Sequence, residues 1–455
     1  MSERLVVTGG TVLTMDQERR EYARGYVLMD DGRIVAVGEG APPADEPGRR
    51  VDATGCVVTP GLVNTHHHLY QWVTRGLAVD ATLFEWLTTL YPVWGCMDEE
   101  SVSAAATAGL ARLAGTGCTT SMDHHYVFPR DGGDLLGAEV EAARVLGLRF
   151  LPTRGSMDLG RSQGGLPPDH VVEDLDTILT ATAEAVDRFH DPSPDSMLRI
   201  GVAPCSPFSV TDTLLKEAAA LARDKRVRLH THLAETMDED AFCRERFGCG
   251  PVEYLGSLGW LGKDVWYGHG IHLDDEAVTQ MASTGTGVAH CPSSNARLGA
   301  GIARLRDLRD ASVPVGLGVD GAASNEASSL LEEARHALLF ARARGGPQAL
   351  SVRAALEVAT IGGATVLGWE DQIGSLEVGK QADLAVWRID GLSHVDIADP
   401  VAGLVLGDRP PLKLLLVGGR PVVEDDRLLT VDEESLTHRA AAASTALLER
   451  AGVAA

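Results

Sequence analysis

The sequence predicts an α/β protein: a (β/α)8 TIM barrel with a small β-sandwich domain that is built from both ends of the chain. Two patterns lead to this prediction. Between residues 60 and 372, short apolar runs alternate with longer stretches rich in Ala, Leu, Glu and Arg, as in repeated βα units. Outside that region, short β-branched runs are separated by Gly and Asp. With 455 residues, 44% of them hydrophobic, the chain is long enough for both parts.

The small domain is expected to begin with residues 1–59. This part contains RLVVTGGTVLTM and GYVLMDDGRIVAVGEG, in which the pairs Gly-Gly and Asp-Gly predict antiparallel hairpins. Residues 373–455 show the same pattern in IGSLEVGKQADLAVWRID and LKLLLVGGRPVVEDDR, and they end in ESLTHRAAAASTALLERAG, which predicts a helix. We therefore expect the two ends of the chain to pair in one sheet.

The barrel is expected over residues 60–372, because eight runs in this part of the chain have the length and composition of buried strands. Stretches such as EESVSAAATAGLARLAGTG and TDTLLKEAAALARDK supply helices between them. Eight successive βα units predict a closed barrel. In chain order, the eight runs are TPGLVNTHHH, TTSMDHH, LRFLPTRGS, LRIGVAPCSP, VRLHTHLAE, VWYGHG, GVAHCP and VPVGLGVD.

The net charge and the cysteine content indicate which kinds of partner and metal site the protein can have. The formal net charge is −24, with 64 acidic and 40 basic residues, which argues against nucleic acid or an anionic membrane as the partner and favours a small-molecule substrate. Seven cysteines without a Cys-x-x-Cys pair predict neither a disulfide framework nor a cysteine zinc site. The first residues, MSERLVVTGG, lack the basic and apolar regions of a signal peptide, so we expect a cytoplasmic location.

Polar residues accumulate at the carboxyl ends of the expected strands, where barrel enzymes hold their active sites. Three consecutive histidines follow the first strand. Since successive side chains of a strand point to opposite faces, His66 and His68 should face the barrel mouth and His67 the helix layer. The polar residues at the strand ends are His66, His68, His124, His125, Arg154, Cys205, His232, Glu235, His269, His290 and Asp320.

These strand ends predict a metal site. Histidine is a common ligand of zinc and other divalent transition metals, and a catalytic site uses about three or four protein ligands. Besides His66 and His68, candidates occur in HTHLAE after the fifth strand, GHG after the sixth and GVDG after the eighth. His230 shares a face with His232 but would lie two residues deeper, roughly 6–7 Å down the strand, so we expect it to be a packed core histidine.

Four of these motifs together resemble the metal-dependent amidohydrolase superfamily. They are GLVNTHHH, HTHLAE, GHG followed by IHLDD, and LGVDGAASNEASSLLEE. The resemblance covers nearly the whole chain, including GSLEVGKQADLAVW in the small domain, and it points to the branch of cytosine, guanine and S-adenosylhomocysteine deaminases and s-triazine hydrolases. Within this branch, HHHLYQWVTR, LYPVWGCMDEE, TSMDHHYVFP, DLGRSQGGLPPD and HTHLAETMDE are most similar to the 8-oxoguanine deaminases.

The resemblance implies that His66, His68, His232 and Asp320 are metal ligands. It implies one divalent ion rather than two, because LRIGVAPCSP contains no lysine that could bridge a pair of ions. Zinc and ferrous iron accept the same ligands, and we expect Zn²⁺ with Fe²⁺ as the alternative.

The acid and base roles fall to three side chains near these ligands. A bound divalent ion lowers the pKa of its water from about 15.7 to roughly 7. Asp320 would take the proton that the attacking water releases, and Glu235 would deliver a proton to the adjacent ring nitrogen. His269 would contact the attacking water or the developing alkoxide. The ring would then release ammonia.

The substrate contacts are expected from amide and aromatic side chains. An amide offers both a donor and an acceptor to the edge of a heterocycle, whereas an aromatic ring offers a flat wall, although aromatic residues near strand ends also serve plain packing. The segment Glu85–Leu87 predicts a lid, and the Gly-Gly pair at 164–165 predicts a second mobile loop. The candidate contacts are Gln71, Trp94, Tyr126 and Asn295, with Tyr70 and Trp86 beside them.

The resemblance implies a deaminase that converts 8-oxoguanine to urate, with isocytosine as a smaller substrate. The alternative is an s-triazine amino- or chlorohydrolase that acts on hydroxyatrazine-like compounds. Some triazine hydrolases have a neutral residue at the strand-eight aspartate, so the presence of Asp320 favours ammonia release. A third reading, a non-catalytic assembly protein, predicts loss of ligands or of the acid and base pair, and all of these are present. Relatives in this superfamily commonly self-associate, so we expect a homo-oligomer.

Overall fold

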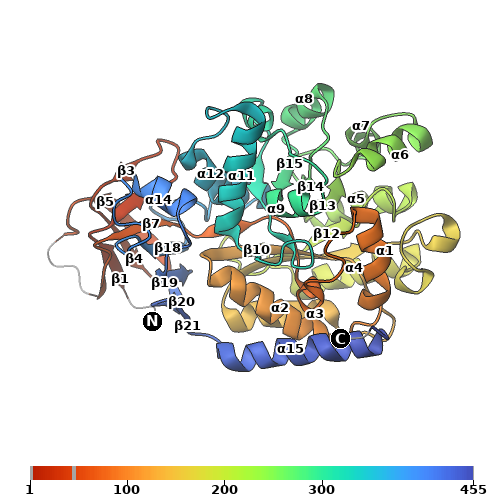
Figure 1. Ribbon diagram of the computed structural model, residues 1–455, viewed down its shortest axis with the longest axis horizontal. Helices are drawn as coiled ribbons and strands as arrows, with labels where there is room; N and C mark the ends of the chain where they lie inside the picture. The colour runs from red at the N-terminus through yellow and green to blue at the C-terminus, as the bar shows by residue number, and fades with distance from the viewer. Residues whose placement is uncertain (1–3, 44–47, 454–455) are drawn as a thin grey trace.

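The structure is a computed structural model that describes residues 4–43 and 48–453 (Figure 1). Its centre is a closed barrel of eight parallel strands, so the predicted barrel is confirmed. All eight predicted strands take part, and the barrel closes where Leu317 pairs with Asn64. In barrel order the strands are β8 (Leu62–Asn64), β10 (Cys118–His125), β11 (Arg149–Ser156), β12 (Gly201–Pro204), β13 (Arg228–Leu233), β14 (Val265–His269), β15 (Gly287–His290) and β16 (Val315–Leu317).

Helices alternate with these strands and surround the barrel (Figure 1). Most of them begin where a Ser, Thr or Asp side chain accepts the backbone N–H three residues further on, which satisfies one of the unpaired donors of the first turn. The helices are α2 (Glu99–Ala114), α3 (Leu135–Leu146), α4 (Leu175–Phe189), α5 (Asp212–Lys225), α6 (Met237–Phe247), α7 (Pro251–Ser257), α8 (Asp275–Thr284), α9 (Pro292–Arg297), α10 (Leu305–Asp310), α11 (Leu330–Gly345), α12 (Val352–Ala359) and α13 (Ile361–Leu367).

Beside the barrel lie two further sheets (Figure 1). One has the order β5-β4-β1-β6, and the other has the order β21-β20-β19-β18-β7-β2-β3. Apolar side chains from both sheets form one buried cluster, so they pack as a sandwich. The strands are β1 (Leu5–Thr8), β2 (Thr11–Leu13), β3 (Glu21–Tyr22), β4 (Gly25–Asp30), β5 (Arg33–Glu39), β6 (Arg49–Asp52), β7 (Cys56–Pro60), β18 (Leu384–Arg388), β19 (Leu412–Val417), β20 (Arg420–Glu424) and β21 (Arg427–Leu428).

The two ends of the chain meet in the larger sheet. Strand β7 pairs with β18 in antiparallel register, with Pro60 opposite Leu384 and Cys56 opposite Arg388. It pairs with β2 on its other side. Pairing of the two ends is therefore confirmed, while the exact domain boundaries at 59/60 and 372/373 stay a prediction.

One predicted hairpin is wrong. The Asp-Gly turn between β4 and β5 and the Gly-Gly turn between β19 and β20 do join antiparallel neighbours. The pair Gly9-Gly10 instead carries the chain from one sheet to the other, since β1 pairs with β4 and β6 whereas β2 pairs with β3 and β7. A Cβ atom on Gly10 would lie 2.7 Å from the carbonyl oxygen of Ala53, so this glycine permits a close backbone approach at the crossing.

The predicted terminal helix is α15 (Glu433–Arg450), which lies along α2 on the outside of the barrel (Figure 1). Its Ser444 Oγ donates to the carbonyl oxygen of Val73 at 2.7 Å, in the short helix η1 (Leu69–Thr74) that follows the histidine run. Ala443 and Leu447 belong to the same buried cluster as Tyr70 and Trp86. The C-terminal helix therefore supports the segment that comes directly after the candidate metal ligands.

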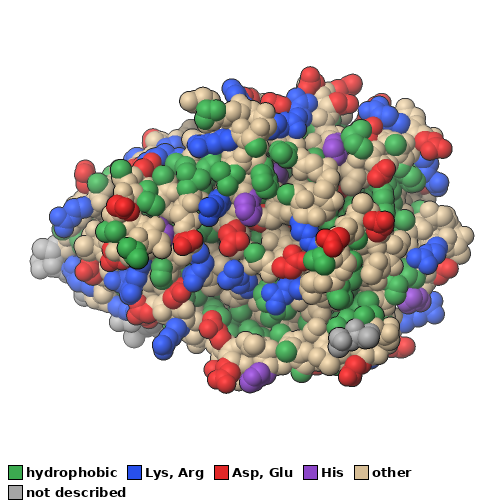
Figure 2. Space-filling model, viewed as in Figure 1, with side chains coloured by type: hydrophobic (Ala, Val, Ile, Leu, Met, Phe, Trp, Pro, Cys, Tyr) green, Lys and Arg blue, Asp and Glu red, His purple; other side chains and the backbone are tan. Residues whose placement is uncertain are grey.

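The surface carries both signs of charge. On the face shown in Figure 2, Asp and Glu side chains are interspersed with Lys and Arg over the barrel helices and the sandwich. Within residues 4–43 and 48–453, no helix combines the length and apolar character needed to cross a bilayer.

Candidate metal centre

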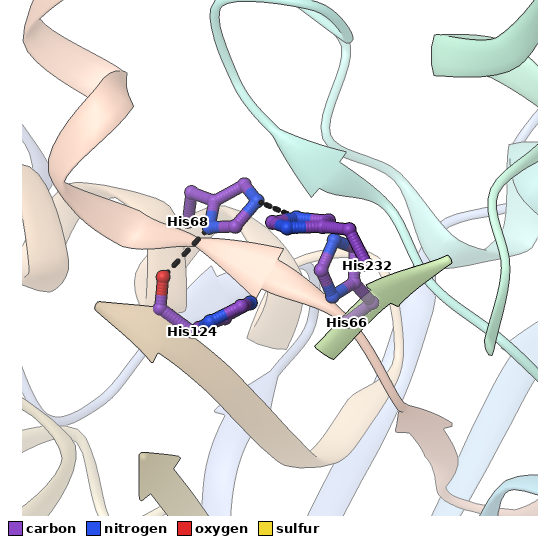
Figure 3. Close-up of side chains that lie close together, drawn as sticks. All are labelled: His66, His68, His124 and His232. Atoms are coloured by element: carbon purple, nitrogen blue, oxygen red, sulfur yellow. Dashed lines mark hydrogen bonds between the residues drawn. The ribbon is translucent and has the colours of Figure 1, made fainter. Parts of the chain in front are cut away.

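Side chains from separate strands converge at the carboxyl end of the barrel. Figure 3 shows His66 and His68 from the start of the barrel, His124 from β10 and His232 from β13 around one point. One ligand atom from each of these four histidines lies within 4.8 Å of the others. Asp320 opens the short strand β17 (Asp320–Gly321), which pairs with β9 (His67–His68) and so brings the carboxylate to the same point.

The distances among the predicted ligands suit one small divalent ion. His68 Nε2 lies 3.0 Å from His232 Nε2, and Asp320 Oδ1 lies 3.3 Å from both His66 Nε2 and His68 Nε2. Four donors at about 2.0–2.1 Å from a zinc ion in tetrahedral geometry would be about 3.3 Å apart. The donor atoms thus have the separation that one small divalent cation requires.

The tautomers of His68 and His232 are fixed by carbonyl groups. His68 Nδ1 donates to the carbonyl oxygen of His124 at 2.7 Å, and His232 Nδ1 donates to that of Cys205 at 2.7 Å. A carbonyl oxygen only accepts, so each ring carries its proton on Nδ1 and a lone pair on Nε2. The two Nε2 lone pairs face each other at 3.0 Å, an arrangement that a bound cation would stabilise.

His66 obtains the same tautomer through a second histidine. His230 Nδ1 donates to the carbonyl oxygen of Trp266 at 3.0 Å, so its Nε2 is free to accept. His66 Nδ1 donates to that Nε2 at 2.8 Å, which leaves a lone pair on His66 Nε2. Among the described residues, this buried Nε2 has no hydrogen-bond partner. His230 is packed in the core as predicted, with its ring stacked on Trp266 at 4.6 Å, but the sequence did not show that it also orients a ligand.

Two further histidines complete this layer. As expected, His67 faces the helices, since a Cβ atom on Gly109 of α2 would lie 3.7 Å from its Nε2. His124 stacks on His232 with ring centroids 4.7 Å apart and donates from Nε2 to the carbonyl oxygen of Ala203. The sequence placed His124 at a strand end but not among the ligands, because single-strand alternation does not show which rings from neighbouring strands meet.

The three side chains predicted for acid and base chemistry lie beside the ligands. His269 Nε2 is 3.6 Å from Glu235 Oε2 and 4.0 Å from Asp320 Oδ2. Asp320 Oδ2 also accepts a hydrogen bond from Ser294 Oγ at 2.6 Å. On the other side, His269 Nδ1 donates to Asn295 Oδ1 at 2.9 Å. The two carboxylates therefore share one histidine as a neighbour.

The surroundings of the two carboxyl groups shift their pKa values in opposite directions. Burial raises the pKa of Glu235 to about 6. Burial would also raise the pKa of Asp320, but the neighbouring histidines His66, His269 and His68 hold it well below its usual range. Burial lowers the pKa of His269, and the charges of Glu235 and Asp320 outweigh this effect and raise it overall. One carboxyl is thus favoured as an acid and the other as a base.

The backbone at these strand ends adopts an uncommon conformation. Ala234, His269 and Asp320 have φ values of 54°, 71° and 61°. Side chains other than Gly seldom occupy this left-handed region, and it costs about 1–3 kcal/mol per residue, so its occurrence is concentrated at functional sites. These three residues follow or end the strands β13, β14 and β16, at the end of the barrel where the side chains converge.

A cavity opens beside the ligands. Gln71 and Tyr126, two of the candidate substrate contacts, line it. Trp94 is fully buried behind the wall, where its Nε1 donates to Thr74 Oγ1. Asn295 instead contacts His269. The residues around the cavity are His68, Gln71, Leu83, Trp86, Leu87, Tyr91, Tyr126, Leu166, Cys205, Ser206, Phe208, Ser209, His232, Glu235, Glu239, His269, Leu298, Asp320 and Ser324.

Both segments predicted to cover the site contribute to this wall. The first is part of helix α1 (Leu83–Trp94), from which Trp86 and Leu87 reach the cavity. Trp86 Nε1 also donates to the carbonyl oxygen of Ala323 at 3.3 Å, across the mouth of the barrel. Glu85 points elsewhere and forms a capping box with Thr82. From the second segment, Leu166 lines the cavity next to the Gly-Gly pair.

Comparison with known proteins places this site in a family. The profile of the Amidohydrolase family matches residues 57–419. The 8-oxoguanine deaminase of Pseudomonas aeruginosa is 46% identical over 431 residues, 94% of this chain and 95% of that protein. An isoxanthopterin deaminase of an unknown prokaryotic organism is 39% identical, over 95% of this chain and 93% of that protein. The structure of atrazine chlorohydrolase from Arthrobacter aurescens TC1 complexed with zinc has a TM-score of 0.92 and 33% identity, covering 97% of this chain and 100% of that one. The chain belongs to the amidohydrolase family.

Proposed function

We propose that the protein is a metal-dependent aminohydrolase that converts 8-oxoguanine to urate with release of ammonia. The observation that carries this proposal is the convergence of three histidine lone pairs and the Asp320 carboxylate beside Glu235 and His269. The 46% identity to an 8-oxoguanine deaminase supports this choice of substrate. Isocytosine, which shares the 2-amino-4-oxo edge, is the smaller substrate that we expect the same site to accept.

We propose that His66, His68, His232 and Asp320 hold one Zn²⁺ ion. Such an ion supplies a water whose pKa is lowered to roughly 7. The protein contributes the three Nε2 lone pairs, each fixed by a hydrogen bond from Nδ1 to a carbonyl oxygen or to His230. Fe²⁺ is the alternative, because the same nitrogen and oxygen donors suit it.

Asp320 and Glu235 divide the proton transfers. Asp320, held ionised by its neighbours, accepts a proton from the attacking water as the new C–O bond forms. Glu235, whose pKa is raised to about 6, delivers a proton to the ring nitrogen next to the attacked carbon. His269 donates from Nε2 toward the attacking oxygen and balances its developing negative charge. Asp320 then passes its proton to the exocyclic amine, the C–N bond breaks with release of ammonia, and the hydroxyl proton returns to Glu235 as the carbonyl group forms.

Gln71 is the side chain best placed to read the substrate. It lines the cavity, and neither its amide nitrogen nor its amide oxygen has a hydrogen-bond partner among the described residues, although both are buried. Unpaired buried polar atoms are costly, so they indicate a ligand that would pair with them. A lactam edge offers the matching groups, because its N–H can donate to the amide oxygen of Gln71 and its C=O can accept from the amide nitrogen.

Tyr126 supplies an edge of the aromatic wall beside Gln71. We propose that Trp94 and Asn295 act from behind this wall. Trp94 packs at 5.4 Å against Tyr70, and Asn295 orients His269. We therefore propose that Trp94 and Asn295 affect the substrate indirectly, through Tyr70 and His269, rather than by direct contact.

The test is ammonia release from zinc-loaded protein with five compounds: 8-oxoguanine, isocytosine, guanine, cytosine and a hydroxytriazine. We expect turnover of 8-oxoguanine that Asp320→Asn abolishes. If another base is turned over and 8-oxoguanine is not, the proposed substrate is wrong. The proposed metal-dependent mechanism would still be consistent with that result.

An s-triazine hydrolase is the second candidate, favoured by the close structural match to atrazine chlorohydrolase. It is also favoured by the 35% identity to hydroxydechloroatrazine ethylaminohydrolase of Pseudomonas sp., over 91% of this chain. Turnover of the hydroxytriazine alone in the same assay would select it.

We further infer a cytoplasmic homo-oligomer that acts on small molecules. The net charge of −24 supports a small-molecule substrate rather than nucleic acid. The resemblance to a superfamily whose members commonly self-associate supports the oligomer. Light scattering on the purified protein, with a mass above one chain as the expected result, tests the oligomeric part.

A further inference from the structure

Glu239 is a buried carboxylate that touches the candidate acid only through the backbone. It lies in the first turn of α6, is 1% exposed, and borders the cavity. Its Oε1 accepts the N–H of Ala234 at 2.9 Å, and its Oε2 accepts the N–H of Glu235 at 3.0 Å. Nothing in the proposed mechanism uses this side chain.

The hydrogen bonds of Glu239 differ from those of an ordinary helix cap. Thr236 is the N-cap of α6, and its Oγ1 accepts the N–H of Glu239 at 3.3 Å, which is one half of a capping box. In the other half, the glutamate would accept the N–H of the N-cap residue itself. Here the carboxylate reaches one and two residues further back, so it stabilises the turn before the helix rather than the helix end.

That turn carries the candidate proton donor. Ala234 has a φ of 54°, an uncommon conformation for a residue with a Cβ atom. Its carbonyl oxygen accepts the N–H groups of Ile271 and His272 at 2.8 and 2.9 Å, which ties the turn to the loop after His269. The turn therefore sets the position of Glu235 relative to His269, whose Nε2 lies 3.6 Å away.

We propose that Glu239 is a positioning residue, whose carboxylate holds the Ala234–Glu235 turn so that Glu235 faces the reacting ring. This inference rests on the proposed function, in which Glu235 is the proton donor. An ionised carboxylate can accept two N–H groups with its two oxygens. Glutamine has the same size but only one accepting oxygen, and its NH₂ group would meet one of the two N–H donors.

The first test compares Glu239→Gln with Asp240→Asn. Asp240 is the next residue of the same helix, where it pairs with Arg244 on the surface. For Glu239→Gln we expect kcat to fall about 10- to 100-fold with KM changed less than about threefold, as for other residues that orient a catalytic group. Zinc content should be unchanged, because Glu239 contacts no ligand. Asp240→Asn should match the wild type in both constants. A kcat within about twofold of wild type for Glu239→Gln would overturn the proposal.

The second test asks whether Glu239 acts through Glu235. We would measure kcat for Glu235→Gln, Glu239→Gln and the double variant. If Glu239 only positions Glu235, the double variant should match Glu235→Gln within about twofold. Losses that multiply would overturn the proposal. Wild-type activity in Glu235→Gln would instead refute the donor role on which the proposed function depends, and the two failures are thereby distinguished.

A folding defect is checked by thermal unfolding of each variant. If Glu239→Gln does not fold, Glu239→Asp replaces it, since the shorter carboxylate keeps its charge and withdraws from the two N–H groups. The same fall in kcat with constant KM supports positioning, and unchanged kcat overturns it.

Discussion

His230 shows how a single side chain can orient a candidate metal ligand, His66, without belonging to the ligand set. Because His230 Nε2 accepts a hydrogen bond from His66 Nδ1, the lone pair of His66 lies on Nε2 and faces the other donor atoms. His230 itself depends on the Trp266 carbonyl for its tautomer. The tautomer of His66 is thus fixed by two successive hydrogen bonds, from His66 to His230 and from His230 to the backbone of the barrel.

We therefore predict that His230→Phe binds zinc about 10- to 100-fold more weakly than the wild type, since removal of an orienting partner typically has an effect of this size. A chelator competition titration measures it. His394→Gln, a change at a buried histidine that donates to the carbonyl oxygen of Asp408 outside the barrel, is the control and should leave zinc affinity unchanged. Equal affinity of His230→Phe and wild type would refute the role of the hydrogen bond.

The raised pKa of Glu235 predicts a pH dependence. The donor role needs the protonated carboxyl, which is the main form below the pKa of about 6 and disappears as the pH rises through it. We expect kcat/KM to contain a limb that falls with rising pH near this value. Glu235→Gln should lose that limb along with most of the activity, and a limb that persists in the residual activity of the variant would assign it to another group.

At the scale of elements, α15 connects the surface of the molecule to the wall of the cavity. Leu447 is fully buried in the cluster that also contains Tyr70, Trp86 and Tyr126. The helix makes this contact although it lies outside the barrel and far from the ligands in sequence. Its packing is therefore part of the shape of the substrate site.

We predict that Leu447→Ala destabilises the protein by about 2–5 kcal/mol, as for other buried leucines, and also raises KM for the substrate. Chemical denaturation and steady-state kinetics measure the two effects. Glu449→Ala, an exposed change in the same helix, should alter neither. A loss of stability with unchanged KM would show that α15 supports the fold without shaping the cavity.

The elements also show what could be predicted from sequence. The barrel strands from β8 to β16 could be predicted from short apolar runs with polar ends. The opposite directions of His67 and its two neighbours could be predicted from strand geometry. The Gly9-Gly10 crossing did not follow, because a Gly-Gly pair serves a hairpin and a crossing equally well. The role of His230 depends on a contact between two strands, which a periodic pattern within one segment does not contain. The bonds that Glu239 accepts from Ala234 and Glu235 are local, but they depend on the conformation of the turn, which the periodic pattern does not show either.

At the scale of the whole molecule, the candidate ligands come from distant parts of the chain. His66 and His68 follow the first barrel strand, His232 ends the fifth, and Asp320 follows the eighth. An ion bound by all four would join the two sides of the barrel closure, where β16 pairs with β8 through Leu317 and Asn64. Bound metal should therefore stabilise the whole barrel.

We predict that removal of the metal by a chelator lowers the Tm by several degrees, and that added Zn²⁺ restores it, because an ion that binds only the folded state stabilises that state. Differential scanning calorimetry measures the shift. Asp320→Asn should show a smaller difference between metal-free and zinc-loaded protein. Equal Tm values for the two wild-type forms would argue against a shared site.

The pairing of β7 with β18 has a consequence for synthesis. Pro60 leaves the ribosome long before its partner Leu384 exists. At about 5–20 residues per second, the delay is roughly 15–65 s. Throughout this interval, one edge of β7 in the nascent chain lacks its neighbour, and an unpaired apolar strand edge is a template for pairing with other chains. Expression yield should therefore depend on translation speed and on chaperones more strongly than the stability of the finished enzyme would suggest.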